Sequence, residues 1–265
     1  MVTFSLILLV CVTLLIPLVG VIVYSYIKDQ GWVPLALGMS CMGLTILAVR
    51  MILPAFLYHY SWFVDLVANR SLFAVVYALS FTLVLFGLTW LAFRFNIKKP
   101  DISRAVVFGF GQGLFYEALY VGFNGLSAML SSNVAAVNEE QLGGVYLAML
   151  EAVCILILYS GFSCLFYIGR KQKKPLFMAA YPCLVFLMMY LGSAWMEIWH
   201  LPRLLLELLM AAAAAGMGCY LYRNVPWKTF FKNDQPEEEE EDLEFLESLE
   251  RLKEETASSP KNRKS

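Results

Sequence analysis

The chain has 265 residues, of which 60% are hydrophobic and 15% are charged, with a mean hydropathy of +0.65 and a formal net charge of −1. Soluble domains contain about 45–50% apolar and about 25% charged residues, so this composition excludes an ordinary soluble protein and indicates a multi-pass membrane protein. A net charge near zero also excludes the basic surface of a nucleic-acid-binding protein, so no nucleic-acid partner is expected.

Seven apolar segments are long enough to cross a bilayer, which requires about 20 residues. Helices are the expected spanning structure, because a helix satisfies its own backbone hydrogen bonds in lipid. Long apolar runs without alternating polarity argue against a barrel. We therefore predict an all-α bundle of seven transmembrane helices within residues 1–222, the first being retained rather than cleaved as a signal peptide. The expected spans are residues 3–26, 32–58, 72–94, 103–131, 143–169, 176–196 and 202–222.

Basic residues near the ends of the expected spans are distributed asymmetrically. Twelve fall on one side of the membrane, and only Arg70 and Arg203 fall on the other. Because cytoplasmic connections carry the excess of lysine and arginine, we predict that the N-terminus is outside and the C-terminus is cytoplasmic. Such a chain is expected in the cell membrane as a multi-pass protein, in contact with membrane lipid.

Residues 223–265 form a second region of different composition. Twelve of the 21 acidic residues lie from Asp234 onward, and leucine recurs every third residue from Leu243 to Leu252. We interpret this charged cytoplasmic tail as a short acidic amphipathic helix with a disordered end. A solvated appendage is favoured over a docking helix for a cytosolic partner, because runs of like charge usually repel.

Neither a metal site nor a cofactor is expected. The six cysteines all lie in apolar segments without CxxC spacing, so we interpret them as thiols that behave as small hydrophobic side chains. His59, Asp65, Glu197 and His200 lie on the two connections expected at the outer boundary. We interpret them as interfacial polarity rather than as metal ligands.

Four charged residues lie within expected spans, where charge is costly and usually faces protein or water. They are Arg50, Glu117, Glu151 and Glu207. Arg50 and Glu151 each lie eight residues from the outer end of their span, so we expect these two side chains to pair across helices. Glu207 follows Arg203 by four residues, a spacing that predicts an ion pair along one helix.

The segment GFGQGLFYEALYVGFNG, residues 109–125, combines small and polar residues inside the fourth expected span. At 100° per residue, one face of this helix carries a stripe made of Gly109, Gly113, Glu117, Tyr120 and Asn124. Further glycines on the opposite face allow close packing on both sides. We therefore predict that this helix is the centre of the bundle and that Glu117 faces the bundle interior.

Three segments resemble the YhfC-type intramembrane peptidases, a family grouped with the CAAX-prenyl-protease-like membrane enzymes and the anterior-pharynx-defective subunit of gamma-secretase. VVFGFGQGLFYEALYVG is similar to that family's GxGHGxxEA block. The resemblance continues in LEAVCILILYSGFSCLFY, which is similar to an ER…H…S block, and in LFMAAYPCLVFLMM, which lies where the family has an AxxxH segment. It covers about residues 40–195 and implies a helical bundle with an intramembrane hydrolytic site.

The residues that the resemblance assigns to catalysis are mostly substituted. The third span, FTLVLFGLTWLAF, lacks the family's paired glutamates and arginine. The histidine positions hold Gln112 or Gly113, then Tyr159, then Tyr181 or Pro182. Hydrolysis in a membrane needs a water that is activated by a general base or a metal. The substituted side chains cannot act as a general base near neutral pH, and they are not common metal ligands.

We therefore expect a non-catalytic member of this fold, a pseudoenzyme, that binds a membrane protein or a transmembrane peptide. Two alternatives stay open: an active glutamic-type intramembrane protease that uses Glu117 and Glu151, and a transporter or transporter subunit with a polar cavity around Glu117. No catalytic residue is assigned. The candidate binding residues are Arg50, Gln112, Glu117, Asn124, Glu151 and Tyr159.

Overall fold

The computed structural model describes residues 2–27, 32–97, 101–130 and 139–225. All the secondary structure in these residues is helical, and no strand occurs among them. Beyond Val225 the predicted acidic tail lies outside the described residues. The all-α prediction is therefore confirmed for the part of the chain that the structure describes.

Short π-helical segments join successive α-helices into longer rods. A π-helix arises where backbone bonds reach five residues back, as when the Leu53 N–H donates to the Ala48 carbonyl. The elements are α1 (Val2–Val10), η1 (Cys11–Leu15), α2 (Ile16–Ile27), α3 (Trp32–Ile46), η2 (Leu47–Ile52), α4 (Leu53–Leu57), α5 (Ser61–Ala68), α6 (Arg70–Leu91), η3 (Ala92–Asn96), α7 (Ile102–Glu117), η4 (Ala118–Gly122), α8 (Phe123–Leu130), α9 (Glu139–Lys171), α10 (Pro175–Glu197) and α11 (Arg203–Asn224).

Six of these rods are long and apolar enough to cross a membrane: Trp32–Leu57, Arg70–Phe95, Ile102–Ser127, Gly143–Lys171, Pro175–Gly192 and Arg203–Asn224. They correspond to the last six of the seven expected spans. The first expected span is also helical, but its apolar part, Phe4–Gly20, is shorter than the other six. In its described residues the protein is thus all-helical, with six helices suited to a multi-pass membrane protein.

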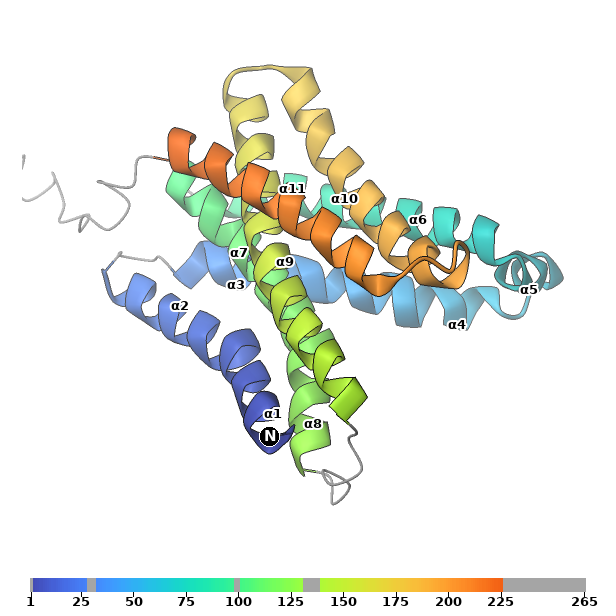
Figure 1. Ribbon diagram of the computed structural model, residues 1–265. Coiled ribbons are helices and arrows are strands. Elements are labelled where there is room, and N and C mark those ends of the chain that lie inside the picture. The colour runs from blue at the N-terminus through green and yellow to red at the C-terminus, as the bar shows by residue number, and fades with distance from the viewer. Residues whose placement is uncertain (1, 28–31, 98–100, 131–138, 226–265) are drawn as a thin grey trace, which may run out of the picture.

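Helix α9 is the most enclosed helix of the bundle. It crosses the middle of the molecule and packs against α1, α7, α10 and α11 (Figure 1). Within its most apolar stretch 83% of the residues are buried, compared with 50% for the rod that contains α7. The prediction that residues 103–131 form the central helix was therefore wrong. That rod lies between α3 and α9, and its second half reaches the surface.

Glycines let α7 approach its neighbours at backbone distance on two sides. A Cβ on Gly109 would collide with the backbone of Tyr159 and Ser160 in α9, and a Cβ on Gly111 would collide with the Leu35 carbonyl in α3. On the α3 side of the same contact, Gly38 lies against the Phe108 carbonyl of α7, where a Cβ would collide with it. The prediction of close packing on both faces is confirmed, because only a residue without Cβ fits at these contacts.

The cysteines are free thiols, as expected, but not all are buried. Cys41, Cys154 and Cys164 lie in the core, whereas Cys183 and Cys219 are exposed on the outside of the bundle. In a membrane these two side chains would face lipid or a partner helix.

Substituting alanine for Gly109 tests the backbone contact between α7 and α9. We expect Gly109→Ala to lower the stability of the purified protein by about 1–3 kcal/mol, because the added methyl group overpacks a contact made by backbone atoms. Thermal unfolding in detergent measures the effect.

Gly87→Ala is the matched control. No atom lies within 4 Å of the position of its added Cβ, so this change should be neutral or stabilising by up to about 1 kcal/mol, as is usual for glycine to alanine in a helix. Equal melting temperatures for the two variants would contradict a backbone contact at Gly109.

Candidate functional site

The structure does not bring the six candidate residues together at one place. Gln112 belongs to a buried hydrogen-bond network, and Glu117 and Tyr159 are buried without hydrogen-bond partners. Arg50 and Asn124 are exposed. Glu151 belongs to an ion cluster on another helix pair. The candidate set is therefore not one enclosed site.

The buried network joins four helices. The Gln112 Nε2 donates to Thr89 Oγ1 at 3.0 Å, and the Tyr181 hydroxyl donates to Gln112 Oε1 at 3.2 Å. The Ser163 hydroxyl donates to the same Oε1 at 3.4 Å, and the oxygens of Thr89 and Tyr181 are 3.0 Å apart. All four side chains are buried. The network therefore links α6, α7, α9 and α10 at one level of the bundle.

Two members of this network are candidates for histidine positions of the resemblance: Gln112, with Gly113 as the alternative, and Tyr181, with Pro182 as the alternative. The structure brings them into direct contact, which a motif comparison cannot establish. Thr89 and Ser163 were missed from the sequence, although each is a polar residue in an otherwise apolar span. An amide and three hydroxyls bond to one another here, and none of these groups is a general base near neutral pH.

Glu117 is 1% exposed, so the prediction that it faces the bundle interior is confirmed. Neither of its carboxyl oxygens has a hydrogen-bond partner among the described residues, and the same is true of the Tyr159 hydroxyl. The carboxylates of Glu151 and Glu207 lie close enough to act on Glu117 electrostatically. Burying an ionised carboxylate without a partner is costly, so Glu117 is the least satisfied of the candidate residues.

The predicted pair of Arg50 and Glu151 does not form. The Arg50 guanidinium instead lies 4.7 Å from the ring centroid of Tyr120, in cation–π contact. Both residues lie in π-helical segments, η2 and η4, where side chains no longer follow a rotation of 100° per residue. Equal depth therefore did not determine the direction in which Arg50 points.

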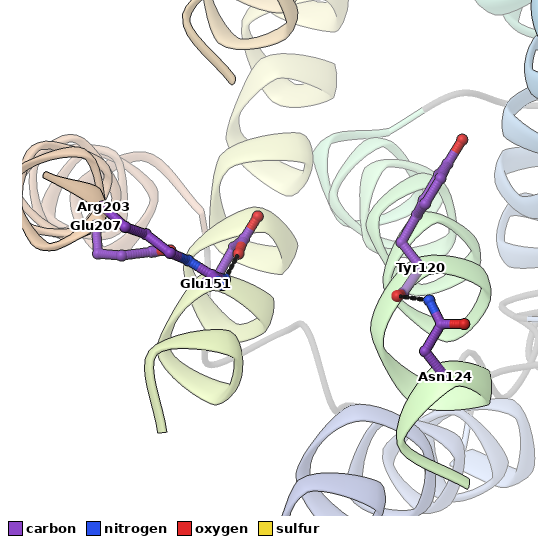
Figure 2. Close-up of polar contacts among 5 residues, drawn as sticks. All are labelled: Tyr120, Asn124, Glu151, Arg203 and Glu207. Carbon is purple, nitrogen blue, oxygen red and sulfur yellow. Dashed lines mark hydrogen bonds and ion pairs between the residues drawn. The ribbon is translucent and has the colours of Figure 1, made fainter. Parts of the chain in front are cut away.

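The same change of helical pitch ends the expected stripe after Glu117. Asn124 lies beyond η4, is exposed, and donates from Nδ2 to the Tyr120 carbonyl at 2.6 Å (Figure 2). Its side chain therefore satisfies its own helix, and it does not line a site with Glu117.

Glu151 forms part of an ion cluster between α9 and α11 (Figure 2). Its Oε2 is 2.9 Å from an Arg203 guanidinium nitrogen, and Arg203 Nε is 3.1 Å from Glu207 Oε1. The predicted Arg203–Glu207 pair is thus confirmed. Arg203, rather than Arg50, is also the ion-pair partner of Glu151. The side chain of Glu207 is 2% exposed, whereas those of Arg203 and Glu151 are 39% and 29% exposed.

The polar residues at the expected outer boundary come together only in part. Asp65 and His200 line one shallow surface pocket with Asn69 and Arg70. Within the described residues, no group of three or more His, Cys, Asp or Glu side chains could hold a metal ion. The side chain of Glu197 lies outside the described residues.

Comparisons with known proteins provide no relative for this chain. No protein-family model, no curated protein and no solved structure matches it.

The network predicts different effects for the two fully buried tyrosines. Tyr181→Phe should lower stability by about 1 kcal/mol, because it removes the bonds of the hydroxyl to Thr89 and Gln112. Tyr159→Phe should be neutral or stabilising, because its hydroxyl is buried without a partner. Thermal unfolding of the two purified variants compares them directly, and a greater loss for Tyr159→Phe would refute the network.

The ion cluster predicts that Arg203→Met destabilises the protein by about 1–3 kcal/mol. The loss should be smaller than for a fully buried pair, because Arg203 and Glu151 are partly exposed. Adding Glu207→Gln should restore part of the loss by removing the carboxylate left unpaired. Denaturation of the single and double variants measures this coupling, and strictly additive losses would contradict it.

Proposed function

We propose that the protein is a non-catalytic membrane scaffold that binds a transmembrane segment of a partner. The observation that carries this proposal is the closed hydrogen-bond network of Gln112, Thr89, Ser163 and Tyr181. Intramembrane hydrolysis needs a water activated by a base or a metal. Here Gln112 and Tyr181, which the resemblance places at or next to histidine positions, bond to one another instead.

The proposal includes seven spans in the cell membrane, with the N-terminus outside and the C-terminus in the cytoplasm. The rod from α1 to α2 supplies the seventh span. The basic residues favour this orientation, with twelve near one membrane face and two near the other. In support, α5 and the C-terminal end of α11 lie at opposite ends of the molecule (Figure 1).

The glycine stripe of α7 is not the surface on which we place the partner, because α9 and α3 already cover it. Helix α11 offers a better surface. Ala212, Gly216 and Cys219 are exposed and share one face at helical spacing, and no atom lies within 4 Å of a Cβ built on Gly216. Small residues four apart on a membrane helix allow a second helix to approach closely.

One observation favours a second candidate, a transporter or transporter subunit. Glu117 and the Tyr159 hydroxyl are buried and lack partners among the described residues, as expected of groups that would engage a proton or a small polar substrate in another state. The glutamic-protease alternative has less support, because Glu151 is already paired with Arg203.

The scaffold proposal predicts a photocrosslinked adduct from α11. A photoreactive side chain placed at Ala212 should give a discrete protein adduct in native membranes, and the same group at Leu83, which is 59% exposed on α6, should give none. Gly216→Leu should lower the yield at Ala212 severalfold by blocking close approach. Gly87→Leu is the control, because it also adds bulk where no atom lies within 4 Å.

Two results would contradict the proposal. One is an adduct at Ala212 that persists unchanged in the Gly216→Leu variant. The other is cleavage of a membrane-anchored peptide by the purified wild-type protein that Glu117→Gln abolishes. Uptake of a solute into proteoliposomes that depends on Glu117 would instead support the transporter.

A further inference from the structure

A groove lies where the Trp32–Leu57 rod, α5 and α6 meet, and it shares no lining residue with the network or with the small-residue face of α11. It has a volume of about 660 Å³. Its walls combine apolar side chains, among them Val49, Leu53 and Phe73, with the polar groups of Arg50, Arg70 and Tyr77. The proposed partner-binding surface uses none of these residues.

The charge of this groove is of one sign. Arg50 and Arg70 line it, and neither forms an ion pair with a carboxylate in the part of the chain that the structure describes. Arg50 contacts the π face of Tyr120 and also hydrogen-bonds with the Tyr77 and Tyr120 side chains. A guanidinium carries five N–H donors, so donors remain for an anion. Asp65 shares a neighbouring surface pocket with Arg70 but does not line this groove. Two guanidiniums without an ion-pair partner are complementary to an anion.

The depth of Arg50 restricts which anion can reach it. Arg50 lies seven residues before Leu57, the last residue of α4, which corresponds to about 10 Å along the helix axis. An exposed arginine at such a depth is costly in lipid unless its side chain reaches toward the interface and binds a polar group there. Arg70 begins α6, at the end of the neighbouring span, and so lies closer to the interface.

We propose that the groove binds the headgroup of an anionic phospholipid. Its phosphate would bind between Arg50 and Arg70, because guanidinium groups recognise phosphate oxygens with paired hydrogen bonds. Its acyl chains would lie along the apolar wall and the adjoining exposed side chains, among them Met51 at 64% and Phe56 at 72% exposure. The occupant therefore matches the groove in charge and in polarity.

Lipid binding to the purified full-length chain tests this site. Native mass spectrometry in detergent would compare one-to-one complexes with phosphatidylglycerol and with phosphatidylcholine. The wild type should bind phosphatidylglycerol roughly tenfold more tightly, as expected for two arginines that act on one anionic headgroup. Arg50→Gln and Arg70→Gln should each reduce this preference, and the double variant should abolish it.

Arg94→Gln is the matched control, because Arg94 is also an exposed arginine that contacts aromatic rings in a π-helical segment, but outside the groove. It should retain the preference. Where Arg50→Gln does not fold, Arg50→Lys and the surface variant Arg70→Gln replace it. Equal affinity for the two lipids, or an equal loss in Arg94→Gln, would overturn the proposal. Displacement of the lipid by excess inorganic phosphate would show a free-phosphate site and would also overturn it.

Discussion

Close backbone contact between α7 and its two neighbours is the constraint on which the other features of the bundle depend. Gly109 brings α7 against the backbone of Tyr159 and Ser160, and Gly111 brings it against the Leu35 carbonyl. Lipid is as apolar as leucine, so membrane helices associate through packing and interhelical hydrogen bonds rather than through the hydrophobic effect. Gly109 therefore sets the spacing between α7 and α9, across which Gln112 reaches Ser163.

Polar groups within the bundle are stabilised in different ways. The network around Gln112 satisfies its members with neutral hydrogen bonds, and the Arg203 cluster combines one guanidinium with two carboxylates. Arg50 contacts an aromatic face and opens onto a groove. Glu117 differs from all of these, since it is buried and unpartnered among the described residues. For this reason the role of Glu117 distinguishes the two proposals: a transporter would use its carboxyl, and a scaffold would not.

The buried network, the exposed small residues of α11 and the groove with Arg50 and Arg70 are three separate parts of the molecule. The network occupies the interior, where it holds helices together. The exposed small residues of α11 are suited to a partner helix, because a helix without bulky side chains allows backbone approach. The groove with Arg50 and Arg70 is suited to an anionic headgroup, because it combines positive charge with apolar walls. A scaffold of this type would engage protein and lipid through separate faces.

The sequence by itself determined the helical class, the six helices long and apolar enough to cross a membrane, and the burial of Glu117. These follow from composition, from apolar length and from the cost of exposing a carboxyl to lipid. It also identified the Arg203–Glu207 pair, whose spacing along one helix is a local property. Only the tertiary structure decided the partner of Glu151, the direction of Arg50 and the central position of α9. These three features depend on how each helix is rotated about its own axis. The π-helical segments that contain Arg50 and Tyr120 depart from 100° per residue, so a helical wheel drawn from the sequence misplaces the side chains there.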